Sequence, residues 1–311
     1  MPLEPHHTTD RLALSVVLCS HARPDYLAVC LAALAAQQDG QAEILVVDSA
    51  SPPGPAERIA ALAAQYGARL VRTDRAGLSL ARNLGLAAAS GAWVAYLDDD
   101  AVPAPDWQAR LLARIASLPA TIGVVGGRIM PRWEAPLPAW WPKGLRGVLT
   151  IVEWEGCGEV GPGTPPDVAV YGANMAFAAQ PLRDVGGFPE ALGRIGNRLL
   201  SGEEEEVVAR LHRRGLRAFY DGAVSVGHSI QQNRLHPAWL LNRLLWQGAT
   251  DALRQRSLRR TAAAAGKLAV QAPLLLWPPA SSALLRARCG AAYNLGYLRG
   301  RLGAPLAEVA A

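Results

Sequence analysis

The chain contains few of the residues that stabilise small secreted or zinc-bound domains. Its 311 residues include only four cysteines, and none of these stand in a Cys-X-X-Cys spacing. The sequence therefore indicates neither a disulfide framework nor a zinc site, and we expect a protein of the reducing cytoplasm. A hydrophobic fraction of 50% with 18% charged residues excludes disorder as the main state. This length provides for one large core, or for one core with an appendage.

Long apolar runs are also scarce. Residues 1–10 hold histidines and prolines but no apolar stretch, so we expect no signal peptide, and residues 1–11 are predicted to be flexible. One uncharged stretch, residues 268–285, reaches the lower limit of the length that can span a bilayer. Pro273 and the pair Pro278-Pro279 interrupt this stretch, so a continuous membrane-spanning helix is not expected.

Acidic residues are nearly absent from the C-terminal end. Residues 231–311 carry 11 Lys and Arg against 2 acidic residues, whereas residues 1–230 carry 20 against 24. Because the basic character belongs to the tail and not to the body, no nucleic-acid partner is predicted. Basic residues around interrupted apolar helices are typical of a segment lying on an anionic membrane surface. We therefore expect a basic helical region over 231–311, which either attaches the protein to the inner face of a membrane or packs on the rest of the chain.

The chain is organised around the stretch Trp93-Val-Ala-Tyr-Leu-Asp98-Asp99-Asp100. A short apolar run after the turn signal Ser90-Gly91 predicts a buried strand of a parallel sheet. In open α/β sheets, ligands bind just beyond the carboxyl ends of such strands. Three carboxylates at that position suit Mg²⁺ or Mn²⁺ beside a phosphate, and they also suit a solvated turn before a helix. The three aspartates alone do not distinguish a metal site from a solvated turn, so the rest of the sequence has to decide between these interpretations.

Strands and helices are predicted to alternate along the first half of the chain. Apolar runs predict strands over residues 12–18, 43–48, 69–72, 93–97 and 122–129. Helical spacing is present after Arg23-Pro24 and over residues 56–66, 77–89 and 106–117. Further strands are expected over 168–178, 216–220 and 223–228. This alternation predicts an α/β fold with a Rossmann-like, mostly parallel sheet flanked by helices, followed by the helical tail.

Residues 131–166 interrupt the alternation. They are rich in proline and glycine and contain four tryptophans, two of which are the neighbours Trp140 and Trp141. A loop of this length is uncommon without a function. Flat indole faces suit sugar rings or a lipid chain, although tryptophan is also frequent in ordinary packing.

A run of four glutamates follows Ser201-Gly202. Acidic residues at the start of a helix complement its exposed N–H groups and its dipole, so all four can act as an N-terminal cap. Four adjacent carboxylates nevertheless repel one another, and one that faces a cleft could serve as a general base. The expected strand over 223–228 ends at His228, which suits either packing or a metal ligand.

Taken in order, these segments resemble the family-2 glycosyltransferases, which have the glycosyltransferase-A (GT-A) fold. The matching segments are residues 14–23, 46–51, Arg75 to Asn83, Asp98 to Asp100, 171–177, Gly187-Phe188 and Gly202-Glu203-Glu204. The resemblance implies a catalytic domain over residues 12–230, with a nucleotide-sugar half over 12–130 and an acceptor half over 131–230. It also implies an inverting enzyme that uses a nucleoside-diphosphate sugar as donor and Mg²⁺ or Mn²⁺ as cofactor. We expect the donor to be a UDP-sugar.

The resemblance also assigns roles to residues. The expected donor-binding residues are Ser20, Arg23, Asp48, Arg75, Arg82, Asp98 and Asp99. The expected metal ligands are Asp98, Asp100 and His228. The family usually has Gly-Glu-Asp where this chain has Gly202-Glu203-Glu204, so the base is expected at Glu204, with Glu203 or Glu205 as the alternatives. Trp140, Trp141 and Asn174 are the expected contacts to a saccharide or lipid-linked acceptor, for polysaccharide or glycolipid synthesis.

Two other classes of function compete with this interpretation. Residues 98–102 also satisfy the Asp-X-Asp-X-Val pattern of haloacid-dehalogenase-type phosphatases, but that class requires a nucleophile on the first strand and a later lysine. Here about ninety residues precede the motif, and the only lysines are Lys143 and Lys267. The second alternative is a non-catalytic member of the same fold that binds a nucleotide or polysaccharide, since a glutamate stands at the base position.

Overall fold

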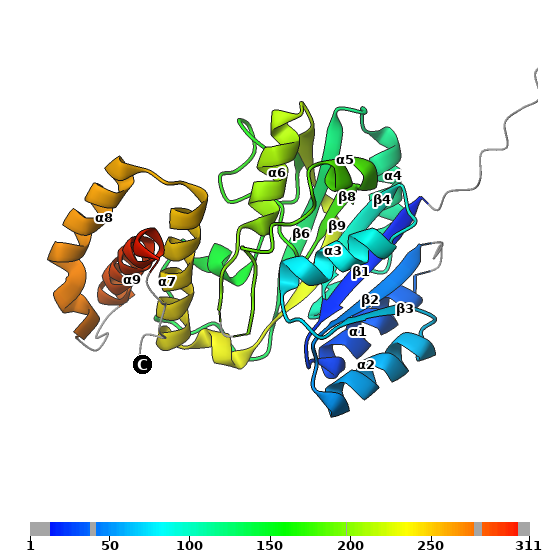
Figure 1. Cartoon of the computed structure of the whole chain (residues 1–311), viewed down its shortest axis with the longest axis horizontal. Coiled ribbons are helices and arrows are strands. Elements are labelled where there is room, and N and C mark those ends of the chain that lie inside the picture. The colour runs from blue at the N-terminus through cyan, green and yellow to red at the C-terminus, as the bar shows by residue number, and fades with distance from the viewer. Residues whose placement is uncertain (1–12, 38–41, 197, 277–281, 304–311) are drawn as a thin grey trace, which may run out of the picture.

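A nine-stranded mixed sheet forms the centre of the part that the structure describes (Figure 1). The computed structural model describes residues 13–37, 42–196, 198–276 and 282–303, so the expected flexible segment 1–11 lies outside the described residues. The strand order is β3-β2-β1-β4-β8-β6-β9-β5, with β7 paired to β9. The strands are β1 (Leu14–Ser20), β2 (Glu43–Ser49), β3 (Arg69–Thr73), β4 (Trp93–Asp98), β5 (Ala101–Pro103), β6 (Ile122–Trp133), β7 (Cys157–Glu159), β8 (Met175–Ala178) and β9 (Arg217–Ile230).

The first four strands run parallel, as their continuous apolar sequences predict. β1 pairs in parallel with both β2 and β4, and β2 pairs with β3. Two clusters of buried side chains cover the two faces of this sheet, and successive residues of β1 alternate between them, with Val16 in one and Val17 in the other. Strands buried on both faces are typical of parallel α/β sheets. The predicted α/β fold class is therefore confirmed.

Six helices pack on the two faces of the sheet within the described residues. One face carries α1 (Pro24–Ala35), α2 (Pro53–Gln65) and α4 (Trp107–Ser117), and the other carries α3 (Leu78–Ala88), α5 (Ala179–Asp184) and α6 (Glu203–Arg213). Proline at the start of α1 and α2 suits the first turn of a helix, where its missing N–H has no helical partner. The parallel order places the carboxyl ends of β1 and β4 side by side.

Two predicted strands differ from the structure. The strand expected over 168–178 is shorter, because the backbone turns at Tyr171, whose carbonyl accepts the Asn174 N–H at 3.0 Å. The strand pair expected over 216–228 is the single strand β9, which pairs in parallel with β6. Its register shifts after Asp221, because residues 222–224 have no partner on β6. This bulge lets the chain pass the turn signal Asp221-Gly222 without ending the strand.

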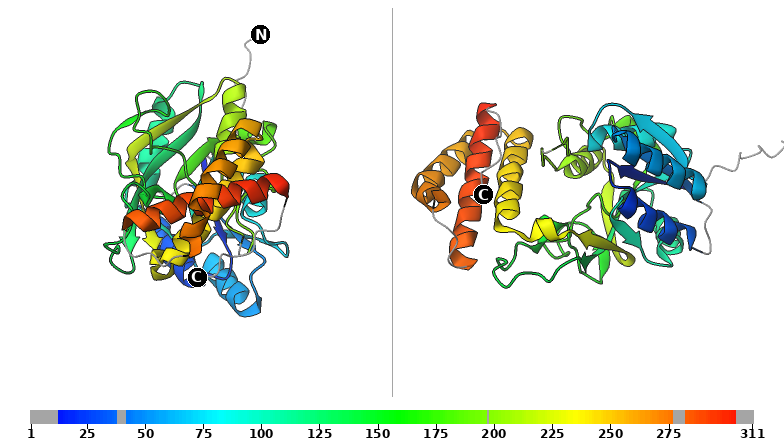
Figure 2. Two further views of the ribbon diagram at one scale, coloured as in Figure 1. Left: turned by 90° about the vertical axis from the view of Figure 1, so that its left-hand side faces the viewer. Right: turned by 90° about the horizontal axis from the view of Figure 1, so that it is seen from below.

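The C-terminal region is helical, as predicted. It contains α7 (Pro237–Arg254), α8 (Leu258–Gln271) and α9 (Ser282–Leu302), which form a layer at one end of the molecule (Figures 1 and 2). Gly248 of α7 lies so close to α9 that an added Cβ would overlap the Tyr293 carbonyl. A shared cluster of buried side chains, including Trp141, Leu149 and Leu240, joins α7 and α9 to the segment 131–152. None of the helices in the described ranges has the length and apolar character that crossing a membrane requires.

Candidate active site

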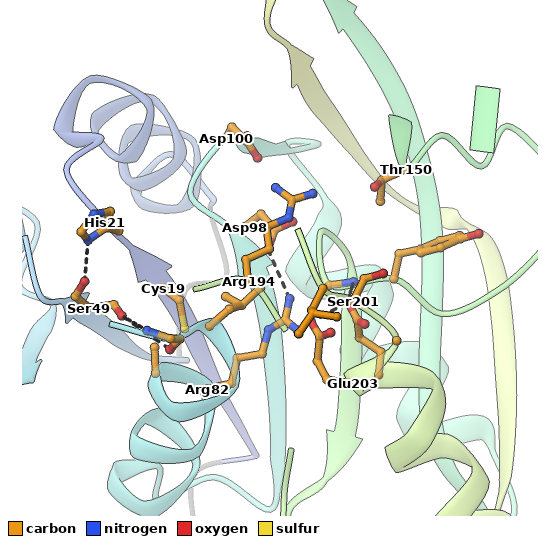
Figure 3. Close-up of a pocket in the computed structure, with 18 of the residues that line it drawn as sticks. Cys19, His21, Ser49, Arg82, Asp98, Asp100, Thr150, Arg194, Ser201 and Glu203 are labelled. Atoms are coloured by element: carbon orange, nitrogen blue, oxygen red, sulfur yellow. Dashed lines mark hydrogen bonds and ion pairs between the residues drawn. The ribbon is translucent and has the colours of Figure 1, made fainter. Parts of the chain in front are cut away.

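A cavity of about 510 Å³ opens at the carboxyl ends of β1 and β4 (Figure 3). Its lining residues come from these strand ends, from the start of α3, from the segments around Thr150 and Tyr171, and from residues 194–205. The short helix η2 (Gln232–Leu235) and α7 close another side through Arg234, Arg243 and Gln247. This volume and this position match the usual ligand site of an open α/β sheet.

The three consecutive aspartates have different environments. Asp98 ends β4, lines the cavity and keeps 30% of its side chain exposed, whereas Asp99 and Asp100 are buried. Ser20 donates a hydrogen bond to Asp99 at 2.7 Å, and Arg23 forms ion pairs with both Asp99 and Asp100. Burial raises the pKa of Asp99 against the opposing charge of Arg23. Asp99 does not line the cavity. Its ion pair with Arg23 instead positions Arg23, which does line it.

Asp100 and His228 lie together because β5 pairs antiparallel with β9. The residue after Asp100, Ala101, stands opposite His228 in this ladder, and His228 Nε2 lies 3.4 Å from Asp100 Oδ1. Gln231 donates to Asp100 Oδ2 at 2.9 Å, and Arg234 lies 3.3 Å from the same oxygen. Burial raises the pKa of Asp100, but His228, Arg23 and Arg234 together hold it well below its usual value.

One buried atom of this group, Asp100 Oδ1, is available to a divalent cation, because it has no hydrogen-bond partner among the described residues. His228 faces the same oxygen with its Nε2, the nitrogen that could share such a cation with Asp100. The part of the chain that the structure describes contains no cluster of three or more His, Cys, Asp or Glu side chains arranged to hold a metal. Mg²⁺ is commonly bound by one or two carboxylates together with substrate phosphates, so a small protein donor set is compatible with a metal–nucleotide complex.

Arg82 connects the aspartates to the glutamate run. Its buried guanidinium donates to Glu203 Oε1 at 2.7 Å and lies 3.4 Å from both Asp98 Oδ1 and Glu204 Oε1. The ring of Phe188 lies beneath it, 5.4 Å from the guanidinium carbon to the ring centroid. Burial disfavours the charge of Arg82, but the surrounding carboxylates keep its pKa raised. One cation therefore fixes carboxylates on the two sides of the cavity relative to each other.

The four glutamates at the start of α6 have four different surroundings. Gly202 precedes the helix with a φ of +82°, a conformation that favours glycine, and no side chain caps the helix. Glu205 also lines the cavity but pairs with Arg254, and Glu206 pairs with Arg210, so ion pairs engage both of these carboxylates. The capping interpretation therefore does not describe all four carboxylates.

Glu203 and Glu204 both line the cavity. Burial and the neighbouring Glu204 raise the pKa of Glu203 against the charge of Arg82, and Glu203 Oε2 has no hydrogen-bond partner among the described residues. Glu204 is more accessible, and its Oε1 accepts the Gly172 N–H at 3.1 Å. Gly172 is tightly packed, because an added Cβ would overlap the Arg82 guanidinium.

Besides Asp99, two of the expected donor-binding residues lie outside the cavity lining. Asp48 is buried at the end of β2, where it accepts from Arg72 Nη1 at 2.5 Å and from the Ser51 N–H at 3.1 Å. Arg75 is exposed and pairs with Glu190 at 3.2 Å. Ser49 and Gly77, next to these two, do line the cavity. Ser20, Arg23, Arg82 and Asp98 line it as expected.

The structure places the three expected acceptor contacts in packing positions away from the cavity lining. Trp141 is buried in the core shared with α7 and α9, and Trp140 packs on it with ring centroids 5.6 Å apart. The Asn174 amide accepts from Trp107 Nε1 at 2.9 Å and donates to the carbonyls of Arg128 and Val224. These side chains therefore hold segments together, because indole and amide groups also satisfy buried packing.

Several lining residues were not among the expected site residues. Tyr171 and Ser201 lie in segments that the sequence singled out, but no role was predicted for them. Arg194, Arg234, Arg243 and Gln247 stand in no motif. Arg243 belongs to the tail, where its charge was counted toward a basic surface region. The packing of α7 over the cavity, which decides its role, depends on the tertiary contacts of the whole C-terminal layer.

The fold and this site define a class: α/β proteins with the GT-A fold. A mannosyltransferase from Pyrobaculum calidifontis, solved in complex with GDP-Man and Mn²⁺, superposes with a TM-score of 0.60 at 22% identity over 94% of this chain and 88% of its own. S. aureus TarS, solved in complex with UDP-GlcNAc, gives a TM-score of 0.55 at 15% identity over 94% of this chain and 92% of its own. These likenesses show the fold.

Within this class, residues 15–157 match the model described as Glycosyl transferase family 2, so the chain carries a domain of that family. A glucosyl-dolichyl phosphate glucuronosyltransferase of Haloferax volcanii is 30% identical over 56% of this chain and 55% of its own. The pre-mycofactocin glycosyltransferase of Mycobacterium tuberculosis is 29% identical over 60% of this chain and 37% of its own. The chain thus spans about half of these relatives' length or less. The phosphatase alternative is wrong, because the Asp98–Asp100 motif lies inside the matched domain.

Proposed function

We propose that this protein is an inverting glycosyltransferase that moves a sugar from a nucleoside-diphosphate sugar to an acceptor hydroxyl. The observation that carries this proposal is one cavity with aspartates at one side, glutamates at the other, and Arg82 between them. The first group suits a diphosphate leaving group, and the second suits a general base. The fold of the neighbours and the family domain agree with such an enzyme.

The donor end of the proposed site is formed by Asp98, Asp100, His228, Arg23 and Ser20. Asp98, Asp100 and His228 would hold a Mg²⁺ or Mn²⁺ ion, which supplies positive charge to the diphosphate when bound. Asp99 accepts hydrogen bonds from both Ser20 and Arg23, and this keeps Arg23 next to the other two aspartates. We still predict that Asp48 and Arg75 contact the nucleotide of the donor, since they are close in sequence to the lining residues Ser49 and Gly77.

Glu204 is the proposed general base. As the acceptor oxygen attacks C1 of the sugar, its proton passes to a carboxylate oxygen of Glu204. The new C1–O bond forms as the bond from C1 to the diphosphate oxygen breaks, and the nucleoside diphosphate leaves with that electron pair. One displacement inverts the anomeric centre. Glu203 is not the proposed base. It accepts a hydrogen bond from Arg82 and therefore positions the guanidinium group.

The nucleotide can be tested by direct binding. We expect UDP to bind the purified protein more tightly than GDP, with Mn²⁺ strengthening the preferred nucleotide by tenfold or more, since the ion joins the diphosphate to the aspartates. Isothermal titration of UDP and GDP, each with Mn²⁺ or with EDTA, measures this directly. Tighter binding of GDP would assign the donor to the guanosine class of the Pyrobaculum relative. Binding of neither nucleotide would contradict the proposed donor site.

We further propose that the C-terminal layer attaches the protein to an anionic membrane on the cytoplasmic side, next to a lipid-linked acceptor. The outer face of α8 supports this proposal. Ala264 is its one buried residue within the described chain, whereas Leu258 and Val270 are 81% and 80% exposed. Arg259 and Lys267 are exposed on the same helix. Exposed apolar side chains with basic neighbours suit the interface of an anionic bilayer.

Liposome sedimentation tests this attachment. We expect the protein to pellet with vesicles that contain anionic lipid, less so at high salt, and the double variant Leu258→Ser/Val270→Ser to stay mostly in the supernatant. Val29→Ser, at a 47% exposed position of α1, is the matched control and should pellet like the wild type. Equal recovery of the wild type in the supernatant with anionic and neutral vesicles at low salt would rule out the attachment.

A further inference from the structure

The cavity is lined by as many arginines as carboxylates, but two of its arginines have no ion-pair partner in the described part of the chain. Five arginines line it, and three of them pair with carboxylates: Arg23 with Asp99 and Asp100, Arg82 with Glu203, and Arg234 with Asp100. The other two, Arg194 and Arg243, form no ion pair with any described residue. Unneutralised cations in a cavity are costly unless a ligand of opposite charge binds there.

Arg243 is the better defined of the two. It enters the cavity from α7, and its Nη2 donates to Ser201 Oγ at 3.2 Å. Its Nη1 is buried and has no hydrogen-bond partner among the described residues. Burial and the charge of Arg194 lower its pKa to about 10, so the two guanidinium groups are near enough to repel each other. The fork of an arginine is suited to bidentate binding of phosphate oxygens.

Arg194 reaches the same cavity from the loop between α5 and α6 (Figure 3). Its carbonyl accepts the Leu78 N–H at 3.0 Å, which anchors the backbone at the start of α3. Its side chain is exposed and forms no hydrogen bond with a described residue. A fixed backbone with an unengaged guanidinium leaves Arg194 able to close on a ligand.

We propose that Arg194 and Arg243 form an anion subsite for the acceptor, which binds a phosphate ester close to the hydroxyl that is glycosylated. The inference rests on the proposed function, because it uses Glu204 to mark the acceptor side. Arg243 marks the base end of the cavity, because it donates to Ser201 and feels the charges of Glu203 and Glu204. Arg194 lies between the two ends, since its charge acts both on Arg243 and on Arg234, which pairs with Asp100. The pair therefore reaches from the base end toward the diphosphate, where an acceptor phosphate beside the attacked sugar would lie.

The test uses the protein saturated with UDP and Mn²⁺, so that donor phosphate positions are filled. Glucose 1-phosphate, glucosyl citronellyl phosphate and methyl glucoside are then titrated as probes by calorimetry. We expect the two phosphates to bind and the uncharged glucoside to bind at least tenfold more weakly. Arg243→Gln and Arg194→Gln should each weaken phosphate binding by about tenfold to a hundredfold, the range for loss of a charged hydrogen bond. Arg243→Lys should lose less, since it keeps the charge.

Arg58→Gln is the matched control, because Arg58 is exposed on α2 and pairs with Asp25 at 2.5 Å, away from the cavity lining. If the citronellyl probe binds more tightly than glucose 1-phosphate, the natural acceptor is a lipid-linked sugar phosphate. If the two probes bind equally, the acceptor is a free sugar phosphate. Both outcomes support the subsite. Unchanged phosphate binding in both glutamine variants would overturn the inference. Equal weakening of UDP binding in Arg243→Gln would also overturn it, by assigning the arginines to the donor. Failure of the wild type to bind any nucleotide would instead contradict the proposed function.

Discussion

Glu204→Gln is expected to lower kcat by about 10²- to 10⁴-fold, the range for loss of a positioned general base, with the KM for the donor changed by less than about twofold. The amide keeps the size of the side chain and can still accept the Gly172 N–H, so the cavity should keep its shape. It cannot take up the proton of the acceptor hydroxyl. Steady-state kinetics with varied donor and fixed acceptor measure both quantities.

Three neighbouring variants make this result specific. Glu204→Asp should keep measurable activity, because it retains a carboxylate. Glu205→Gln should have a mild effect, since Glu205 is half-exposed and pairs with Arg254. Glu203→Gln should have an intermediate effect, because a glutamine oxygen can still accept from Arg82. An inactive Glu203→Gln beside an active Glu204→Gln would assign the base to Glu203 instead.

Asp100→Asn is expected to abolish transfer while leaving the protein folded. A neutral amide is a poor ligand for Mg²⁺ or Mn²⁺, and it leaves the half-buried charge of Arg23 and the buried charge of Arg234 with less compensation. The direct readout is Mn²⁺ affinity in the presence of UDP, measured by electron paramagnetic resonance, which should fall by tenfold or more. Circular dichroism and thermal unfolding check that the fold is kept.

Asp106→Asn is the matched control, because Asp106 is exposed and pairs with Arg110 four residues later. It should leave both Mn²⁺ affinity and transfer at the wild-type level. Full activity of the wild type after treatment with EDTA, or full activity of Asp100→Asn, would contradict the proposed role of the metal.

The parallel part of the fold could be predicted because local sequence decides it. The runs that become β1, β2 and β4 are mostly apolar, since both faces of these strands are buried. Proline at the start of α1 and α2 marks where these helices begin. These signals do not depend on distant partners, so the order of strands and helices follows from short stretches of the chain.

The elements beyond β6 depend on tertiary contacts and were predicted less well. Residues 168–174 are as apolar as a strand, but they turn so that Gly172 and Tyr171 reach the cavity. β5 is only three residues long, and its pairing with β9 is what brings His228 to Asp100. A segment of that length carries no periodicity that could predict it.

The site was predicted in part for the same reason. Asp98, Asp100 and Glu204 stand in local motifs, and the structure places all three around one cavity. Arg243 stands in no motif, and it reaches the cavity only because α7 packs between α9 and the catalytic part. Trp140 and Trp141 are the opposite case: tryptophans in a long loop suggested a sugar contact, whereas Trp141 is buried with α7 and α9 and Trp140 packs against it.

The most direct test of the proposed function follows the reaction by ¹H NMR with an α-linked nucleoside-diphosphate sugar, Mn²⁺ and the acceptor that gives the highest rate. We predict release of the nucleoside diphosphate with equimolar formation of a β-linked product, no turnover in Asp100→Asn, and turnover slowed by about 10²- to 10⁴-fold in Glu204→Gln. An α-linked product, release of inorganic phosphate in place of the nucleoside diphosphate, or no turnover of any donor would contradict it.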